Sequence, residues 1–440
     1  MVCTSGANRL PRDASERSAA HNEVHVRLPR PLPIPSMTTQ LTVLTDKASG
    51  AAETAHLRRL AATYGAVVDA TDVGLVLDFD EVTALSWERH EGYSLYTIHQ
   101  PLNPAEASAT SDLLTLLPLP TGWLAEIPGR TLSAVHVTLL PADNRSDKDA
   151  TEFAHRALGP GRLGGSRLRD EAARLFTTYQ LAPDGTSRFL MLCEPMTEGR
   201  AGRITGSLLE VERYRMLALL GYPPARTMVS RMTELEASLA DLARQIEDEQ
   251  RDDRQLLDEL IGLSAVIEYE IATHAGRFDA ATAYNAIVHQ RIEYLRGSSL
   301  PGLMGVFTFL RRRLLPAMAT VEAAKDRMEA LSGRVSRTAD VLRTRVEVTA
   351  EVQSQQLLSG LQRGQTLQLR LQQTVEGLSI AAISYYIVGL VGYFTKGLQS
   401  LGVSIDESVT TAAAIPVALI VVWGTVNRMR KHIESPGDSG

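Results

Sequence analysis

The densest group of polar side chains lies in "DFDEVTALSWERHEGY", residues 78–93. Histidine and carboxylate side chains suit divalent cations, so this stretch is a candidate site for a metal ion or a small ligand. In a strand, Trp87, Arg89 and Glu91 share one face, and Glu88 and His90 share the other. A solvent-exposed strand with an Arg–Glu pair has the same pattern, and both interpretations stay open. The candidate polar cluster consists of Asp78, Asp80, Glu88, Arg89, His90 and Glu91.

Sequence motifs of common enzyme classes are missing from the chain. The glycine-rich stretch "GPGRLGGSR", residues 159–167, lacks the Lys-Ser/Thr ending of a phosphate-binding loop, and neither G-x-S-x-G nor HExxH occurs. The two cysteines, Cys3 and Cys193, support neither a disulfide framework nor a zinc site. We therefore expect a protein that is not an enzyme and binds no cofactor, with a divalent cation as a candidate ligand of the polar cluster.

The composition of the 440-residue chain limits its partners. The net charge is -6 and no strongly basic stretch stands out, which argues against a nucleic-acid partner. The first twenty residues contain no apolar core of a secretory signal peptide. We therefore expect the large N-terminal part to remain in the cytoplasm.

Two uncharged apolar runs lie near the C-terminus, at residues 377–395 and 409–426. As a helix, the first run covers roughly the ~30 Å hydrocarbon core of a bilayer. Basic residues flank the pair, whereas the loop between the runs carries Asp406 and Glu407. The positive-inside rule then places both termini in the cytoplasm. The sequence predicts a multi-pass protein of the bacterial inner membrane whose two transmembrane helices form a hairpin in the lipid bilayer.

The first apolar run has two unlike faces. Bulky aliphatic residues lie on one face, and small and polar residues lie on the other, where close approach of another helix or a water-filled pore would need them. Both interpretations stay open. The candidate pore or helix-packing face consists of Ala381, Ser384, Tyr385, Val388, Gly392, Thr395 and Lys396.

The sequence before the apolar runs divides into three predicted parts, and a basic cytoplasmic tail, 427–440, follows the runs. Residues 1–50 are rich in proline and predict an extended arm. Residues 51–200 contain alternating strand patterns and a Pro-Asp-Gly turn, which predict an α+β cytoplasmic domain with a mainly antiparallel sheet. Residues 201–376 have helical periodicity, including a coiled-coil-like seam, and predict a helical bundle with a long stalk helix. A polar helix of this length needs partners, so we expect a homo-oligomer.

Several runs resemble a known family. "WERHEGYSLYT", residues 87–97, and "LQLRLQQTVEGLSIAAISYYIVGLVGY", residues 367–393, are similar to the bacterial membrane-anchored proteins of the domain of unknown function 3422 family. The resemblance covers nearly the whole chain. It implies a membrane-anchored protein and brings no established activity.

The order of the parts also has a looser, architectural similarity to CorA-type magnesium channels. Those channels carry a Gly-Met-Asn motif at the outer end of the first span, where this chain reads Gly392-Tyr393-Phe394-Thr395-Lys396. We therefore expect a membrane-anchored assembly or scaffold protein facing the cytoplasm. The alternatives are a CorA-like cation channel or transporter without that motif, and a ligand sensor that uses the polar cluster.

Overall fold

The computed structural model describes residues 14, 17, 30–46, 48–65, 69–71, 74–102, 113–247, 251–400 and 406–433. The chain divides into two compact units, Met1–Ala339 and Asp340–Gly440. More than half of the residues of the arm predicted over 1–50 lie outside the described residues, as does half of the predicted tail, 427–440.

Within the described residues, the first unit contains one ten-stranded sheet in the order β10-β7-β8-β9-β6-β1-β5-β4-β3-β2. Neighbouring strands are antiparallel except β6 and β9, which are parallel. The central strand β1 lies inside the range 1–50 that the sequence predicts to be an extended arm. The prolines of that range all precede the strand, so they do not interrupt it. The strands are β1 Ser36–Leu44, β2 Asp69–Thr71, β3 Gly74–Asp78, β4 Ala84–His90, β5 Tyr93–Pro101, β6 Arg130–Pro141, β7 Gly164–Leu168, β8 Ala173–Leu181, β9 Ser187–Cys193 and β10 Arg296–Ser299.

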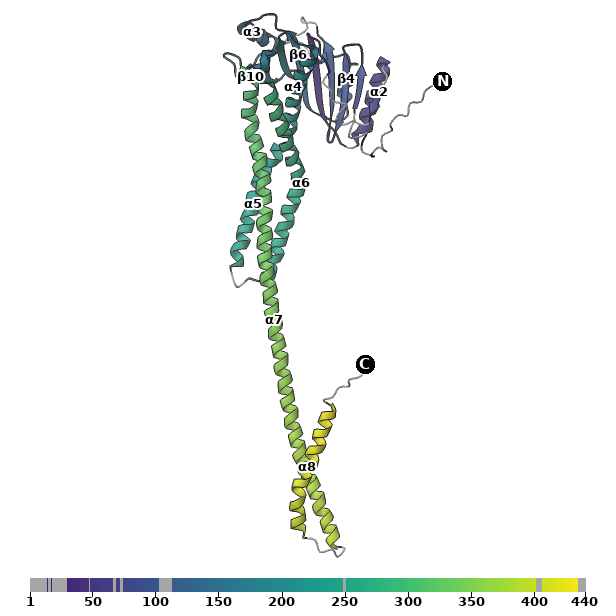
Figure 1. Ribbon diagram of the computed structural model, residues 1–440, viewed down its shortest axis with the longest axis vertical. Helices are drawn as coiled ribbons and strands as arrows, with labels where there is room; N and C mark the ends of the chain where they lie inside the picture. Colours follow the sequence, from purple (N-terminus) through teal and green to yellow (C-terminus); the bar gives the residue numbers. More distant parts are fainter. Residues whose placement is uncertain are drawn as a thin grey trace, which may run out of the picture. The chain divides into compact units, whose positions relative to one another are not determined.

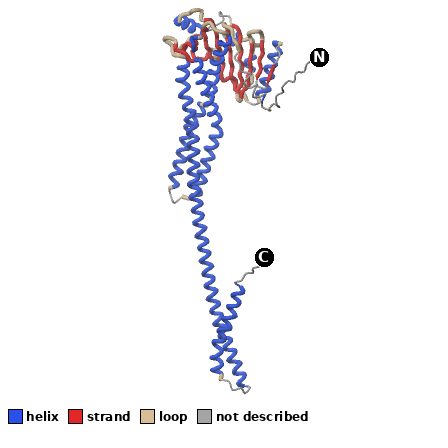
Figure 2. The backbone as a smooth tube through the Cα atoms, in the orientation of Figure 1, coloured by secondary structure: helices blue, strands red, loops and turns tan. Residues whose placement is uncertain are grey.

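Long helices follow strand β9 in the sequence, and the edge strand β10 lies between two of them, α6 and α7 (Figure 1). Figure 2 shows the strands of the first unit gathered in one sheet, with the shorter helices close to it. The predicted order, a sheet region, then long helices and two apolar helices near the C-terminus, is confirmed. The helices are α2 Ser49–Tyr64, α3 Asp147–Leu158, α4 Glu198–Leu219, α5 Tyr222–Ile246, α6 Asp253–Leu295, α7 Val306–Ser400 and α8 Glu407–Ile433, and short 3-10 turns cover Leu113–Leu116, Trp123–Glu126 and Arg169–Glu171.

The two faces of the sheet differ in character. On one face, apolar strand residues such as Met37, Tyr96 and Ile98 pack with Leu57 and Leu60 of α2 in the main core. Because successive residues of a strand point to opposite faces, the residues between them face the other way. Helix α4 contacts β1 and β6 on this second face, where many of the buried residues are polar.

The β8–β9 turn shows how local sequence fixes the sheet. Asp184 accepts hydrogen bonds from the backbone N–H (3.0 Å) and the hydroxyl (2.6 Å) of Thr186, and Gly185 adopts a φ of 79°. Glycine reaches this left-handed conformation without steric cost. The side chain of Arg188 donates to Asp184 at 2.5 Å. The Pro-Asp-Gly signal thus forms the hairpin that the sequence predicts.

Helices α5, α6 and the first part of α7 lie side by side in the first unit (Figure 1). Arg327 of α7 donates to Glu236 of α5 at 2.5 Å, and Lys325 donates to Asp279 of α6 at 2.6 Å. Apolar residues at alternating steps of four and three are buried between them, including Met228, Met232, Leu235, Leu239 and Leu242 of α5. The predicted seam therefore faces other helices of the same chain.

The second unit is built from the rest of α7 and from α8. A side chain added at Gly392 would come within 3.8 Å of the Thr411 hydroxyl, and Val426 shares a cleft with residues of α7 between Gln368 and Ser379. The two helices therefore run past each other in opposite directions. In the described residues, each contains a stretch long and apolar enough to cross a membrane.

Candidate functional site

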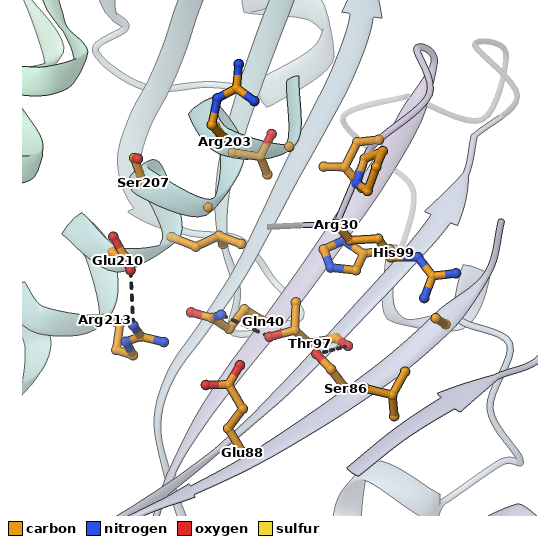
Figure 3. Close-up of a pocket in the computed structure, with 18 of the residues that line it drawn as sticks. Arg30, Gln40, Ser86, Glu88, Thr97, His99, Arg203, Ser207, Glu210 and Arg213 are labelled. Carbon is orange, nitrogen blue, oxygen red and sulfur yellow. Dashed lines mark hydrogen bonds and ion pairs between the residues drawn. The ribbon is translucent and has the colours of Figure 1, made fainter. Parts of the chain in front are cut away.

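A cavity of about 680 Å³ lies between the polar face of the sheet and α4 (Figure 3). Strands β1, β3, β4 and β5 contribute its floor, and α4 contributes one wall. Residues 30–32 and the C-terminal end of α6 complete the lining. The volume is within the range of small-molecule binding sites.

A row of polar side chains crosses the floor. Gln40 of β1, Thr97 of β5 and Ser86 of β4 are in register across three neighbouring strands. The amide of Gln40 donates to the Thr97 hydroxyl at 3.0 Å, and the hydroxyl of Ser86 lies 3.5 Å from the Thr97 carbonyl oxygen (Figure 3). These bonds fix the side chains and orient polar atoms along the floor.

His99 lies beside this row on the same strand as Thr97. Its Nδ1 is 2.9 Å from the Thr38 hydroxyl. Burial lowers the pKa of His99 to about 4, and the nearby charge of Arg30 lowers it in the same direction. At neutral pH, His99 is therefore an uncharged hydrogen-bonding group of the lining.

Arginines and a shared carboxylate form the wall opposite the floor. Arg213 of α4 is only 8% exposed, and its guanidinium lies 3.9 Å from Glu210 and above the ring of Tyr214. Arg291 of α6 forms a close ion pair with the same Glu210 carboxylate. One carboxylate therefore serves two guanidinium groups. Arg203, also on α4, is exposed at the cavity.

Two glycines shape the α4 wall in different ways. A side chain at Gly202 would meet the carbonyl oxygen of Arg30 at 2.0 Å, so this glycine allows residues 30–31 to cross the helix closely. A side chain at Gly206 would meet no other atom within 4 Å. Gly206 lines the cavity, and its missing side chain keeps that part of the cavity open.

The candidate polar cluster does not come together as one site. Asp78 forms an ion pair with Arg30 at 2.7 Å. Asp80 accepts from the backbone N–H groups of Thr83 and Val82, which lower the pKa of its carboxyl group. Among the described residues, no group of three or more His, Cys, Asp or Glu side chains is arranged to hold a metal ion.

The second half of the cluster lies along β4. Glu88 lines the cavity, and His90 stacks on Tyr93 and lies 3.7 Å from Glu88. Arg89 points the other way and lies against Gly50 at the start of α2, while Glu91 is in the turn after the strand. A ligand role for the cluster stays a prediction.

The candidate pore or helix-packing face is divided in the second unit. Ser384 and Thr395 are buried, and Val388 and Gly392 are half-buried. The other three predicted members, Ala381, Tyr385 and Lys396, are exposed. The arrangement suits packing against α8 at the buried positions, and the functional role of the face stays a prediction.

Comparison with known proteins places this sequence in a family. The family described as "Protein of unknown function (DUF3422)" matches residues 12–433. The chain belongs to the DUF3422 family. A comparison with curated proteins finds no match. The predicted family is thereby confirmed, whereas the likeness to CorA-type channels stays a prediction.

In this DUF3422 chain, sequence reasoning missed most of the cavity. Gln40, Thr97, Gly206 and Arg213 were not among the predicted site residues. Two signals were present in the sequence: polar residues alternating with apolar ones in β5, and a glycine in the middle of a helix, which destabilises a helix without a structural reason. Neither signal shows which strand face a helix covers.

Proposed function

We propose that this chain is a membrane-anchored, non-enzymatic protein that assembles into homo-oligomers and acts as a scaffold facing the cytoplasm. In this proposal α7 and α8 form a two-span hairpin in the bacterial inner membrane, and α5, α6 and α7 form a helical bundle with a stalk. The observation that chiefly supports this function is the exposed apolar surface of the second unit.

The apolar stretches of α7 and α8 support the membrane location. Large apolar residues there are mostly exposed, including Leu390, Phe394 and Ile420. Lipid acyl chains cover such a surface, whereas water does not. The basic residues beyond both stretches then favour a cytoplasmic location for both termini.

The part of α7 before its apolar stretch supports self-association. Every residue from 347 to 375 is exposed. Long helices with this much apolar surface are stabilised by packing against other helices. The exposed apolar residues of this segment are Val348, Val352, Leu357, Leu358, Leu361, Leu367, Leu369, Leu371 and Val375.

A second copy of the chain is the partner that suits this segment. The membrane hairpin gives every copy the same orientation, so the segments of two copies run parallel and in register. Leu357, Leu361, Leu371 and Val375 fall on one series of alternating steps of four and three, the spacing of a parallel coiled coil, and Gly364 and Gln368 occupy the two positions between them.

Native mass spectrometry of the full chain in detergent tests the assembly. We expect an oligomer for the natural chain and a shift to monomers for Leu357→Lys combined with Leu361→Lys, because lysine charges repel one another in an apolar seam. The matched control is Gln355→Lys with Gln362→Lys, which adds the same charge on the opposite side of the helix. A monomeric natural chain, or equal behaviour of both variants, contradicts the proposal.

The alternative is a CorA-like cation channel or transporter. The order of the elements favours it, because one helix, α7, continues into the first apolar stretch and a second apolar helix follows. Ser384 and Thr395 supply polar groups in that stretch. Flux of Mg²⁺ or K⁺ into liposomes that contain the purified chain would support this function, and the absence of flux for every ion tested would exclude it.

A further inference from the structure

We infer that the cavity under α4 binds a small organic molecule with one anionic group, a carboxylate or a phosphate ester. This inference goes beyond the scaffold function and is independent of the membrane and of assembly, because every lining residue belongs to the first unit.

The charge balance of the lining favours an anionic group on the ligand. Four arginines and two glutamates line the cavity. Arg30 is already paired with Asp78, which leaves three arginines with two glutamates and an excess of one positive charge. Arg213, the most buried of the three, shares the Glu210 carboxylate with Arg291, so an anion would complete the neutralisation of these two guanidinium groups.

Arg213 is the residue that would hold the anion. It is almost fully buried and shares the Glu210 carboxylate with Arg291, and its Nε has no hydrogen-bond partner. A guanidinium group binds a carboxylate or phosphate through two parallel N–H donors. Thr205, on the same helix, has a buried hydroxyl without a partner beside the cavity.

The size and floor of the cavity favour an organic ligand over an inorganic ion. An inorganic phosphate would fill only a small part of about 680 Å³. Leucines of the lining, Leu32, Leu75 and Leu209, offer apolar contacts to a ligand body. The row of Gln40, Thr97 and Ser86 offers hydrogen bonds to polar groups of that body.

Gly206 supports a ligand-binding role for the space. Glycine in a helix interior is less stable than alanine. No neighbouring atom requires a glycine here, since an added side chain meets nothing within 4 Å. Gly202, one turn earlier, has a structural reason in the close approach of Arg30. The open space at Gly206 leaves room for a ligand at this wall of the cavity.

Isothermal titration calorimetry of the full chain in detergent tests the inference. The probes are 4-hydroxybenzoate, phenyl phosphate and the uncharged 4-hydroxybenzamide. We expect at least one anion to bind about tenfold more tightly than the amide, and the preferred anion identifies the head group. Binding of neither anion more tightly than the amide overturns the inference.

Variants of the cavity locate the binding. Gly206→Phe fills the open space and should abolish binding, whereas Gly206→Ala should keep it and raise the melting temperature. Arg213→Gln should lower the affinity for the anion about tenfold and leave the affinity for the amide unchanged. Arg203→Gln, at an exposed position where folding is not at risk, should weaken the anion severalfold. Unchanged anion binding in Gly206→Phe and Arg203→Gln would overturn the assignment.

Discussion

At the residue scale, His136 is a fully buried histidine in the centre of the sheet. Its Nδ1 lies 2.7 Å from the Thr39 hydroxyl, and its Nε2 has no hydrogen-bond partner. Burial lowers the pKa of His136 to about 4, with a smaller opposing effect from the Asp184 charge and a further lowering by Arg188. The folded protein therefore holds this imidazole in its neutral form.

His136 makes folding stability depend on pH. Between its ordinary pKa of 6.5 and about 4, the unfolded histidine binds a proton that the folded one does not. Stability therefore rises with pH through this range and is lost as the pH falls from 6.5 toward 4. For this residue, the free energy of unfolding falls by on the order of 3 kcal/mol. The lowered pKa of His99 decreases the free energy of unfolding in the same direction.

We expect His136→Gln to reduce this loss, because glutamine does not titrate. The measurement is urea unfolding at several pH values in a Trp423→Phe background, where fluorescence reports the buried Trp87 and Trp123 of the first unit. An equal loss of stability on acidification with and without His136 would show that other groups cause it.

Asp184 and Arg188 form a buried ion pair, with side chains only 5% and 8% exposed. The Thr186 and Arg188 hydrogen bonds together lower the pKa of Asp184 against the opposing effect of burial. Removing one partner of such a pair leaves an uncompensated buried charge.

We expect Asp184→Ala to lower the free energy of unfolding by about 3 kcal/mol. The control is Asp279→Ala, which removes an exposed ion pair with Lys325 and should cost less than about 0.5 kcal/mol. Chemical denaturation of both variants measures the difference. Similar values for the two variants would show that Arg188 finds another partner or reaches water.

At the element scale, the first residue of α7, Val306, is hydrogen-bonded to two strands of the sheet. The backbone N–H of Val306 donates to the Ser166 hydroxyl at 2.9 Å, and the Tyr179 hydroxyl donates to the Val306 carbonyl oxygen at 2.5 Å. Tyr179 also stacks on Phe309, with ring centroids 4.7 Å apart. Strands β7 and β8 thus determine where the longest helix begins.

We expect Tyr179→Phe and Ser166→Ala each to destabilise the first unit by about 1 kcal/mol, since each removes one hydrogen bond from a buried group. Hydrogen exchange of the first turns of α7 should increase in both variants. Tyr269→Phe removes an exposed hydroxyl on α6 and serves as the control. Unchanged exchange in the first two variants would mean that packing alone holds the helix start.

The elements also show what the sequence could predict. The β8–β9 hairpin and the two apolar helices follow from local signals, a Pro-Asp-Gly turn and long uncharged runs. The sequence predicts helical periodicity over 201–376, but it does not predict that residues 253–295 form the single helix α6. The parallel β6–β9 pair depends on long-range contacts that no local pattern contains.

In the candidate site, too, the sequence indicates some residues, whereas only the fold explains why they are close together or far apart. Asp78 and Glu88 stand out by their charge, yet they lie at different places because strand pairing decides their neighbours. Gln40 and Arg213 come from distant parts of the chain and line the same cavity. Their proximity follows from the docking of α4 on the polar face of the sheet, and the sequence contains no local sign of that docking.

At the scale of the whole molecule, one chain combines a unit that contains the sheet with a unit of helices whose apolar side chains are mostly exposed. The average composition, 44% hydrophobic and 22% charged, hides this difference. The first unit buries many of its large apolar residues, including a cluster on one face of the sheet, whereas in the second unit Leu378, Leu390 and Val421 are exposed. Lipid acyl chains would cover such a surface, and the proposed function depends on α7 and α8 as the membrane anchor.

Cysteine labelling in spheroplasts is the most direct test of whether α7 and α8 form a membrane-spanning hairpin. In a chain without its natural cysteines, Ser408→Cys lies at the start of α8 and Gln362→Cys lies before the apolar stretch of α7. If the hairpin has cytoplasmic termini, a membrane-impermeant maleimide labels position 408 from outside, and it labels position 362 only after the membrane is permeabilised. Labelling of both positions from outside, or of neither until lysis, would contradict a two-span hairpin with cytoplasmic termini.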